Sequence, residues 1–299
     1  MKLSILTASY NRGTLLGNLY KSILDNLYDK LDIEWLIMDD GSVDNTENIV
    51  KQFTSKEHLE IKYFKQKNQG KMQAINNLIK YATGELIMDC DSDDHFINNA
   101  FEEIYNKKDI LLKDDELYGL VFLKNENKDK LSGNEFKKEN LKTTMFDLYF
   151  KDTIVGEKMI VFKSDIRKQY KHQLENKEKF ITEARMYHKM DLDYKIKCFN
   201  TIIVEGEYLK NGYTSNINQT FIKCPNGYFN YFKEILERDM KGVTLKKRMY
   251  VIKHYILFSY LANAKTPFKY IKGYFNKILF IIFYIPGKYK SKLFVNSQL

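Results

Sequence analysis

The sequence is poor in the residues that build disulfide-rich, zinc-bound or extended proteins. It has three cysteines, Cys90, Cys198 and Cys224, and no Cys-x-x-Cys spacing, which argues against a disulfide framework or a zinc site and fits a reducing cytoplasm. Only 3 prolines and 14 glycines occur among 299 residues, which argues against collagen-like or long disordered tracts. With 44% hydrophobic and 29% charged residues, the composition is that of a folded protein with a core.

Long apolar runs are also missing. The longest is ILFIIFYI at 278–285, well short of the ~20 residues that a membrane-spanning helix needs. The N-terminal residues MKLSILTASYN become polar too soon for a secretion signal. We therefore expect a cytoplasmic protein, and a position at the inner face of the cell membrane is compatible with this.

Two phosphate-binding loops are absent. No Gly-x-Gly-x-x-Gly follows the first predicted strand, and no Gly-x-x-x-x-Gly-Lys-Ser/Thr occurs anywhere. A Rossmann dehydrogenase and a P-loop NTPase would both lack the loop that holds their phosphates.

Acidic residues are absent from the C-terminal end. From Lys241 to Leu299 the chain has 12 Lys and Arg, 13 aromatic residues and no Asp or Glu, so the net charge of +9 resides there. Residues 226–299 are predicted to be helical, with helices at 244–262 and from Thr266-Pro267 to Pro286. This basic, aromatic region suits an anionic membrane surface, and equally a packed subdomain or a contact in a homo-oligomer. No nucleic-acid-binding motif is present.

The first hundred residues alternate between apolar runs and helical periodicity. Strands are predicted at 2–9, 33–42, 60–65 and 85–90, and helices at 14–28, 44–53 and 70–82. This alternation predicts an α/β fold with a parallel sheet and crossover helices. Later elements are predicted as strands at 118–124, 155–163 and 196–209, in a mixed part of the sheet, and as a short helix at 180–191.

Polar clusters follow three of the predicted strands. These clusters are Tyr10-Asn11, then Asp39-Asp40-Gly41, then Asp91-Ser92-Asp93-Asp94. Because ligands of such sheets bind beyond the carboxyl ends of the strands, we expect the clusters to converge at one edge. Crowded carboxylates are costly unless a cation neutralises them, and Asp-x-Asp offers oxygen ligands for Mg²⁺ or Mn²⁺. A solvated acidic turn is the plainer interpretation.

A helix predicted to begin at Gly70 follows a stretch rich in amides and lysine, 67–77. Its free N–H groups and Lys71 could face phosphate oxygens, although a helix start with a surface lysine is common.

At this point the residues resemble a known family. The segments 4–12, 37–46 and 68–94 resemble the nucleotide-sugar domain of family 2 glycosyltransferases, which have the GT-A fold. A looser similarity at 156–165, 178–190 and 204–216 resembles acceptor-side segments of members that build bacterial surface glycans. The resemblance implies a GT-A catalytic domain at 1–225, with nucleotide-sugar binding in 1–100 and the acceptor side in 101–225.

The resemblance also implies roles for single residues in the nucleotide site. Asp40 matches the residue that hydrogen-bonds the uracil, and Ala8 and Tyr10 match positions that line the nucleoside. Asn68 and Lys71 match positions where the base and diphosphate are held.

The acidic motif is implied to bind the metal. Asp91 matches the residue that touches ribose or metal, and Asp93 matches the ligand of Mn²⁺ or Mg²⁺. Ser92 lies between them, and Asp94 supports the turn.

The resemblance also implies a general base, a carboxylate that takes the proton from the acceptor hydroxyl. Many family members have Glu-Asp at the start of the relevant helix, where this chain has Thr-Glu-Ala, and we assign the base to Glu183. Asp191 and Glu178 are the fallbacks. A first-turn Glu that only complements the helix dipole is the alternative. His188 is expected to point elsewhere in the core, and His95 to be a loop residue near the acidic motif.

The predicted function is therefore an inverting, metal-dependent transfer of one sugar from a nucleotide sugar, a UDP-sugar in the first instance, to a hydroxyl of a surface-glycan or lipid-linked acceptor. Trp35 is the only tryptophan, so the Gln-x-x-Arg-Trp motif of processive members is absent. A noncatalytic nucleotide-sugar or membrane-binding protein on the same fold is the alternative. A sugar-1-phosphate nucleotidyltransferase would need a Gly-rich, Arg-containing loop that SYNRGTLL only poorly provides.

Overall fold

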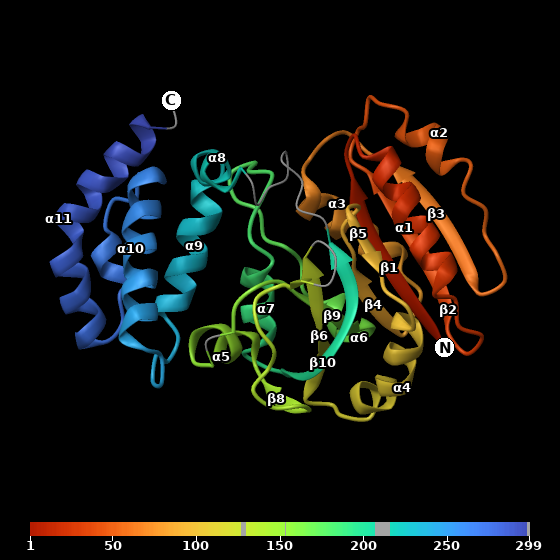
Figure 1. The fold of residues 1–299 in the computed structure, drawn as a ribbon. Helices are drawn as coiled ribbons and strands as arrows, with labels where there is room; N and C mark the ends of the chain where they lie inside the picture. The colour runs from red at the N-terminus through yellow and green to blue at the C-terminus, as the bar shows by residue number, and fades with distance from the viewer. Residues whose placement is uncertain (127–129, 153, 207–215, 298–299) are drawn as a thin grey trace.

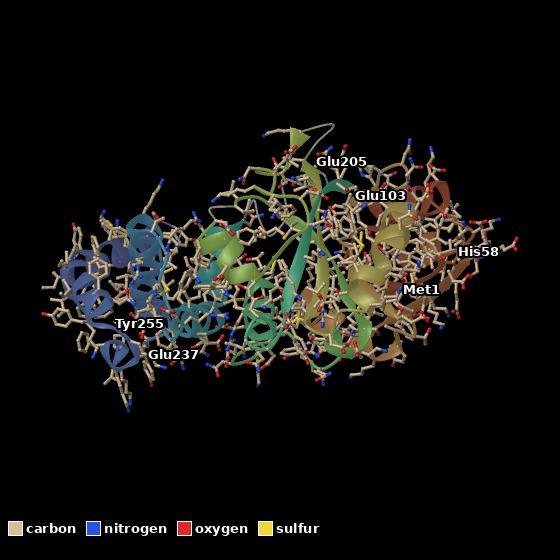
Figure 2. All side chains as sticks on the ribbon, turned by 90° about the horizontal axis from the view of Figure 1, so that it is seen from below. Met1, His58, Glu103, Glu205, Glu237 and Tyr255 are labelled. Carbon is tan, nitrogen blue, oxygen red and sulfur yellow. The ribbon has the colours of Figure 1, made fainter. Side chains whose placement is uncertain are left out.

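A computed structural model of the protein describes residues 1–126, 130–152, 154–206 and 216–297. A central sheet has helices on both faces, and the C-terminal helices form a stack beside it (Figure 1). The side chains in Figure 2 place Met1 and His58 at the sheet end of the molecule, and Glu237 and Tyr255 in the helical stack at the other end. The predicted α/β class, with a basic helical C-terminal region, is confirmed.

In the described residues the sheet has ten strands. In spatial order its main path is β3 (Leu59–Lys65), β2 (Asp32–Asp39), β1 (Lys2–Ser9), β4 (Leu86–Asp89), β9 (Lys158–Lys163), β6 (Leu117–Glu126), β10 (Lys195–Gly206) and β5 (Asp94–Phe96). Two short strands lie off this path, β7 (Lys130–Leu131) beside β6 and β8 (Leu141–Thr143) beside β10.

The first four strands of the path pair in parallel, as the sequence predicts. Strand β9 runs antiparallel to both β4 and β6, and β10 is parallel to β6. Six strands of the path therefore point the same way, while β9 and β5 run against them. The part of the sheet beyond β4 is mixed, as expected.

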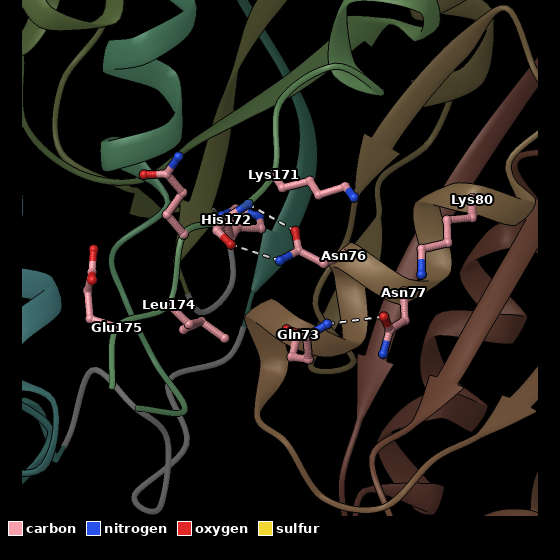
Figure 3. A pocket seen from close by; sticks show the side chains of 9 residues that line it. Gln73, Asn76, Asn77, Lys80, Lys171, His172, Leu174 and Glu175 are labelled. Atoms are coloured by element: carbon pink, nitrogen blue, oxygen red, sulfur yellow. Dashed lines mark hydrogen bonds between the residues drawn. The ribbon is translucent and has the colours of Figure 1, made fainter. Parts of the chain in front are cut away.

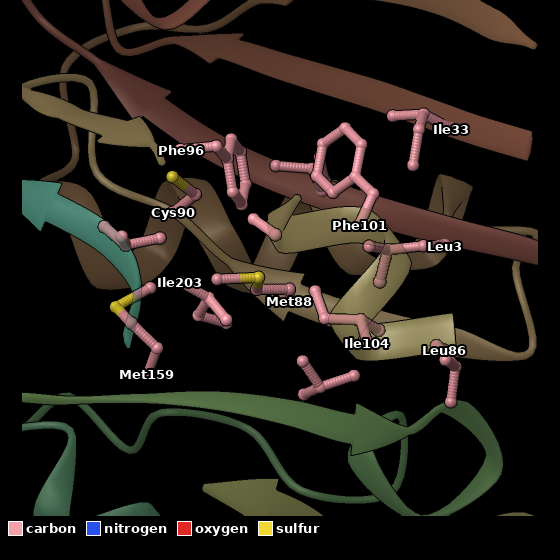
Figure 4. Close-up of a cluster of buried hydrophobic side chains, with 14 of the residues drawn as sticks. Leu3, Ile33, Leu86, Met88, Cys90, Phe96, Phe101, Ile104, Met159 and Ile203 are labelled. Atoms are coloured by element: carbon pink, nitrogen blue, oxygen red, sulfur yellow. The ribbon is translucent and has the colours of Figure 1, made fainter. Parts of the chain in front are cut away.

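The period-two pattern of the strands fills both faces of the sheet. Leu3 and Ile5 of β1 pack with Trp35 in one cluster, part of which Figure 4 shows, while Leu6 and Leu36 belong to a cluster on the other face. The first face is covered by α1 (Gly13–Asp25), α2 (Thr46–Val50) and α4 (Ala100–Leu112). The second is covered by α3 (Lys71–Leu78) with its 3₁₀ extension (Ile79–Tyr81), α5 (Met145–Phe150), α6 (Ser164–Arg167) and α7 (Ala184–Met190).

The C-terminal stack has its own apolar core. It consists of α8 (Ile217–Lys223), α9 (Pro225–Leu236), α10 (Leu245–Leu261), a 3₁₀ helix (Pro267–Tyr270) and α11 (Tyr274–Asn296). Phe232, Tyr255 and Phe258 are buried in this core, which also includes Met72 of α3 and therefore continues into the sheet domain. Helix α10 begins as predicted, because the Thr244 hydroxyl accepts a hydrogen bond from the backbone N–H three residues on.

Two predicted boundaries in this region are wrong. Thr266-Pro267 opens only the 3₁₀ helix, and α11 begins later, after Gly273 with its φ of +80°. Helix α11 does not stop at Pro286 but continues to Asn296. Proline removes one intrahelical hydrogen bond, and we attribute the continued helix to its packing against α10. The two helices are close here, since an added Cβ at Gly287 would lie 2.8 Å from a side-chain carbon of Ile256.

In the described ranges no helix combines the length and the apolarity needed to cross a bilayer. The strand predicted at 196–209 is described up to Gly206. Segment 204–216, which carries part of the looser family resemblance, lies mostly outside the described residues.

Candidate active site

A cavity of about 1250 Å³ lies where the carboxyl ends of β1, β2 and β4 meet. The residues that the sequence predicts for the site all line it: Ala8, Tyr10, Asp40, Asn68, Lys71, Asp91, Ser92, Asp93 and Glu183. The parallel strands explain this convergence, because each strand delivers its following loop to the same edge of the sheet. The structure brings these residues together, and their individual roles stay predictions.

Asp40 is buried and ties the end of β2 to the start of α3. Its carboxylate accepts hydrogen bonds from the backbone N–H groups of Gln69, at 2.8 Å, and Gly70, at 2.7 Å, and from the Gln66 side chain at 2.8 Å. Gly70 has a φ of +92°, and a Cβ there would lie 2.1 Å from the carbonyl oxygen of Lys179. Only glycine fits this position, so the loop that Asp40 holds has one shape.

Two of the clustered aspartates face their own cation. Lys71 Nζ lies 2.5 Å from Asp91 Oδ1, and Arg12 Nη1 lies 3.2 Å from Asp93 Oδ2. The Arg12 guanidinium also donates to the Ser92 hydroxyl at 3.4 Å. Burial raises the pKa of Asp93, the Asp91 charge raises it further, and the charge of Arg12 offsets part of both effects. The cavity wall therefore holds two basic groups beside its acidic motif.

Asp94 is buried more deeply and is paired differently. Lys124 Nζ contacts both of its carboxylate oxygens, at 2.8 and 3.0 Å, and also reaches Glu157 at 2.9 Å. Burial raises the pKa of Asp94 to about 7, against the opposing charge of Lys124. Asp94 is the first residue of strand β5. It fixes the turn that presents Asp91 and Asp93.

Glu183 points its carboxylate into the cavity beside Lys71. Its Oε1 lies 2.8 Å from Lys71 Nζ, and the Tyr187 hydroxyl donates to Oε2 at 3.1 Å. Burial raises the pKa of Glu183, but the Lys71 charge and the two hydrogen bonds outweigh it, so the pKa lies below its usual value. Helix α7 begins at Ala184, so Glu183 occupies the N-cap position, and its side chain accepts no capping hydrogen bond.

The two fallback carboxylates have structural roles instead. Asp191 accepts hydrogen bonds from the backbone N–H groups of Met145 and Phe146 at 3.0 and 2.8 Å, which caps α5. Glu178 accepts from the N–H of Gly227 at 2.8 Å, at the start of α9. Because both carboxylates satisfy the ends of helices and lie outside the cavity lining, neither fits the role of base.

The two histidines differ in their surroundings. His188 is buried and its ring stacks on Tyr231 with a centroid distance of 5.6 Å. Burial, aided by the charge of Arg238, lowers the pKa of His188 to about 3, so its ring is neutral. His95 lies in strand β5, not in a loop, and its Nε2 is 3.6 Å from Glu205 Oε1.

Basic and aromatic side chains of the C-terminal helices also line the cavity. Lys223 comes from α8, and Lys247 and Tyr250 come from α10. In the described part of the chain, neither lysine has an acidic group within 4.0 Å, and Lys247 Nζ lies 6.0 Å from the Phe150 ring centroid. From the sequence, Lys247 and Tyr250 belong only to the basic helical region and Lys223 has no assigned role, because sequence separation hides their approach to the sheet edge.

Sequence reasoning also missed Arg12 and Lys124 as site residues. Both stand at the carboxyl end of a strand: Arg12 lies just beyond β1, and Lys124 lies two residues before the end of β6. That position was the available signal, since it is the same one that singled out the aspartates.

A buried network supports the cavity from behind. Asn76 and His172 exchange two hydrogen bonds, of 2.8 and 2.9 Å, in a hollow of about 580 Å³ beside α3 (Figure 3). Arg167, fully buried, reaches His172 Nε2 at 3.4 Å and the Asp89 carboxylate at 3.0 Å. Because Asp89 lines the cavity, this network fixes the end of β4, directly ahead of the acidic motif.

The residues present fit a divalent ion that shares its coordination with a substrate. No group of three or more His, Cys, Asp or Glu able to hold a metal occurs among the described residues. Asp91 and Asp93 supply two carboxylates on the cavity wall, and Mg²⁺ commonly uses one or two carboxylates together with substrate phosphates and water.

The sheet is flanked by helices, and the predicted nucleotide site and the acidic motif lie at the carboxyl ends of its parallel strands. This is the architecture of a GT-A glycosyltransferase. Residues 4–171, more than half of the 299-residue chain, match Glycosyl transferase family 2. The chain therefore belongs to this family.

Curated relatives match over the N-terminal region. An uncharacterized glycosyltransferase of Mycoplasma pneumoniae is 36% identical over 109 residues, which cover 36% of this chain and 36% of that protein. The GalNAc(5)-diNAcBac-PP-undecaprenol beta-1,3-glucosyltransferase of Campylobacter jejuni is 34% identical over 108 residues, covering 36% of this chain and 34% of that protein. The matched segments span about a third of these relatives' length.

Solved structures match over nearly the whole chain. TarS 1–349 of S. aureus in complex with UDP-GlcNAc superposes with a TM-score of 0.61 at 15% identity, covering 98% of this chain and 92% of that chain. The mannosyltransferase PcManGT of Pyrobaculum calidifontis, in complex with GDP-Man and Mn²⁺, superposes with a TM-score of 0.56 at 15% identity, covering 98% and 84%. At these identities the likeness establishes the shared fold.

Proposed function

We propose that this protein is an inverting glycosyltransferase that moves one sugar from a UDP-sugar to a hydroxyl of a surface-glycan or lipid-linked acceptor. One observation carries the proposal: Glu183, a carboxylate with a lowered pKa, lines the same cavity as the predicted nucleotide-site residues and the acidic motif. The relatives support the substrate classes. TarS is a poly(ribitol-phosphate) beta-N-acetylglucosaminyltransferase solved with UDP-GlcNAc, and the Campylobacter relative is named for an undecaprenol-linked acceptor.

The donor would lie along the carboxyl ends of β1, β2 and β4. We assign Ala8, Tyr10 and Asp40 to the nucleoside, and Asn68 and Lys71 to the base and diphosphate, on the basis of the family resemblance and their place in the cavity. The positive charges of Lys71 and Arg12 would face the diphosphate, whose negative charge grows as it leaves the sugar.

We propose that Asp93 and Asp91 would hold Mg²⁺ or Mn²⁺. The ion would supply further positive charge to the leaving diphosphate. PcManGT solved with GDP-Man and Mn²⁺ supports a metal in this fold.

Glu183 would take the proton of the acceptor hydroxyl. It is ionised because Lys71 and Tyr187 stabilise the carboxylate, so it is ready to accept a proton at neutral pH. Attack of the acceptor oxygen on the face of the sugar opposite the diphosphate would invert the anomeric carbon. The bond from this oxygen to carbon forms as the bond from carbon to diphosphate breaks.

The domain limits and the location belong to the same proposal. Residues 1–225 would form the catalytic domain and 226–299 the basic helical region. The enzyme would act in the cytoplasm, at the inner face of the cell membrane, where lipid-linked acceptors are found.

Calorimetric titration with UDP, in the presence and absence of Mn²⁺ and beside a GDP control, tests the donor site. We expect Mn²⁺-dependent binding of UDP that Asp93→Ala removes. Full transferase activity of Asp93→Ala with added Mn²⁺ would refute the metal assignment. UDP binding with no turnover of any UDP-sugar, in the wild type and in Glu183→Gln alike, would favour the alternative, a noncatalytic nucleotide-sugar-binding protein.

A further inference from the structure

Helix α11 carries a continuous apolar face that no part of the described chain covers. Tyr274, Ile281, Ile285 and Tyr289 are 82%, 64%, 79% and 65% exposed. Their spacing of four and seven residues places them on one side of the helix, together with the half-exposed Leu293. Figure 1 shows α11 as the outermost helix of the stack, with nothing beyond it.

The opposite face of α11 is already used. Leu279 and Phe280 are buried against α10 in the core of the stack, and Asn276 and Ser291 are buried on the same side. The exposed face is therefore not needed to hold the helix in place. Single exposed apolar residues are ordinary, but a row along a helix of 23 residues, about 35 Å long, marks an interaction surface.

Lysines border this apolar face. Lys277 and Lys288 lie three or four residues from Ile281 and Ile285, and Lys292 lies three residues beyond Tyr289. All three are exposed, and within the described residues none forms an ion pair. No Asp or Glu occurs between residues 241 and 299 to balance them.

The charge selects the kind of partner. In a two-fold contact between copies of this chain, the lysines of one α11 would meet those of the other, with no carboxylate in the region to pair them. A surface rich in phosphate, with an apolar interior just beneath it, instead complements both the lysines and the apolar row.

We propose that α11 docks the protein on an anionic lipid surface, with the Tyr274–Leu293 face inserted at the boundary of headgroups and acyl chains and the three lysines against lipid phosphates. This proposal deepens the proposed function. It rests on that function only to explain why the enzyme would be at a membrane. Docking itself needs neither donor nor acceptor.

Co-sedimentation of the full chain with vesicles tests the proposal. Vesicles of equal parts phosphatidylglycerol and phosphatidylcholine are compared with phosphatidylcholine alone, at low and high salt. We expect binding to the anionic vesicles that weakens with salt, and a loss of at least about tenfold in affinity for Ile281→Ser with Ile285→Ser, because two exposed aliphatic side chains no longer insert. Lys277→Gln, Lys288→Gln and Lys292→Gln together should remove the preference for anionic lipid.

A matched control comes from apolar residues exposed elsewhere. Val43 and Leu192, which are 86% and 70% exposed on the sheet domain, are both replaced by Ser, and this variant should bind vesicles as the wild type does. Wild-type-like binding by the Ile281, Ile285 variant, or equal binding to neutral and anionic vesicles, would overturn the proposal. So would a wild-type dimer, seen by light scattering, that the same variant abolishes. UDP titration of each variant separates the two proposals, since donor binding should be unchanged when vesicle binding is lost.

Discussion

Lys71 bridges two carboxylates that belong to different elements of the site: its ammonium lies 2.5 Å from Asp91 Oδ1 and 2.8 Å from Glu183 Oε1. One partner follows strand β4 and the other precedes helix α7. Both carboxylates raise the pKa of Lys71 well above its ordinary value, against the effect of burial, so the bridge is charged at neutral pH. A diphosphate that drew Lys71 toward itself would break the ion pair with Glu183. Binding of the donor would then free the Glu183 carboxylate to take the acceptor proton.

Glu183→Gln removes the carboxylate and keeps its shape. We expect kcat for the release of UDP from UDP-GlcNAc, or from whichever UDP-sugar proves active, to fall by about 100-fold or more, because a positioned base contributes that much. UDP affinity measured by calorimetry should stay near the wild-type value. Glu116→Gln is the matched control, because Glu116 is an exposed carboxylate just before β6, at the end of that strand far from the cavity. Unchanged kcat in Glu183→Gln would remove Glu183 from the role of base.

Lys71→Met leaves Glu183 buried without its cation. Burial then raises the pKa of Glu183, since the opposing charge that lowers it is gone. The base must be ionised to act, so the acidic limb of the kcat/KM profile should move to higher pH. Lys71→Arg keeps a charge and should move the limb less. An unmoved limb in Lys71→Met would show that another group sets the profile.

Lys124→Met should destabilise the fold strongly, because Asp94 remains buried with its main partner removed. We expect a loss of about 1–3 kcal/mol in the free energy of urea unfolding at pH 7, because Asp94 then takes up a proton and stays buried without its partner. The double variant with Asp94→Asn should recover part of it, since the amide is neutral without taking up a proton. Lys163→Met, whose partner Asp115 is fully exposed, should cost at most about 1 kcal/mol. Equal losses in Lys124→Met and Lys163→Met would contradict the buried pair.

His188 makes folding stability depend on pH. Its pKa is about 6.5 in the unfolded chain and about 3 in the folded protein, where burial excludes the proton. Its contribution is therefore fully present above pH 6.5 and is lost as the pH falls through 6.5 toward 3, because only the unfolded state binds the proton. Unfolding at pH 7 and pH 5 measures this. His188→Phe should reduce the difference between the two values, and an unchanged difference would place the effect on other groups, such as the buried His172.

The elements that could be predicted are those set by local patterns. The apolar runs that form β1, β2 and β4, and the loops that carry Tyr10, Asp40 and Asp91, follow from alternation and from the residues just beyond each strand. Parallel pairing then places these loops at one edge, which is why the predicted residues share a cavity.

What local patterns could not supply is which side chain meets which. Lys124 pairs with Asp94 across 30 residues, Arg167 with Asp89 across 78, and Glu178 with Gly227 across 49. Periodicity reports only on neighbours within a turn or a strand, whereas the energy of an ion pair or a cap depends on distance in space. The order of strands in the sheet sets that distance, so only the tertiary structure decided that Glu178 and Asp191 hold helix ends, that Arg12 and Lys124 balance the acidic motif, and that Glu183 alone of the three candidate bases opens on the cavity.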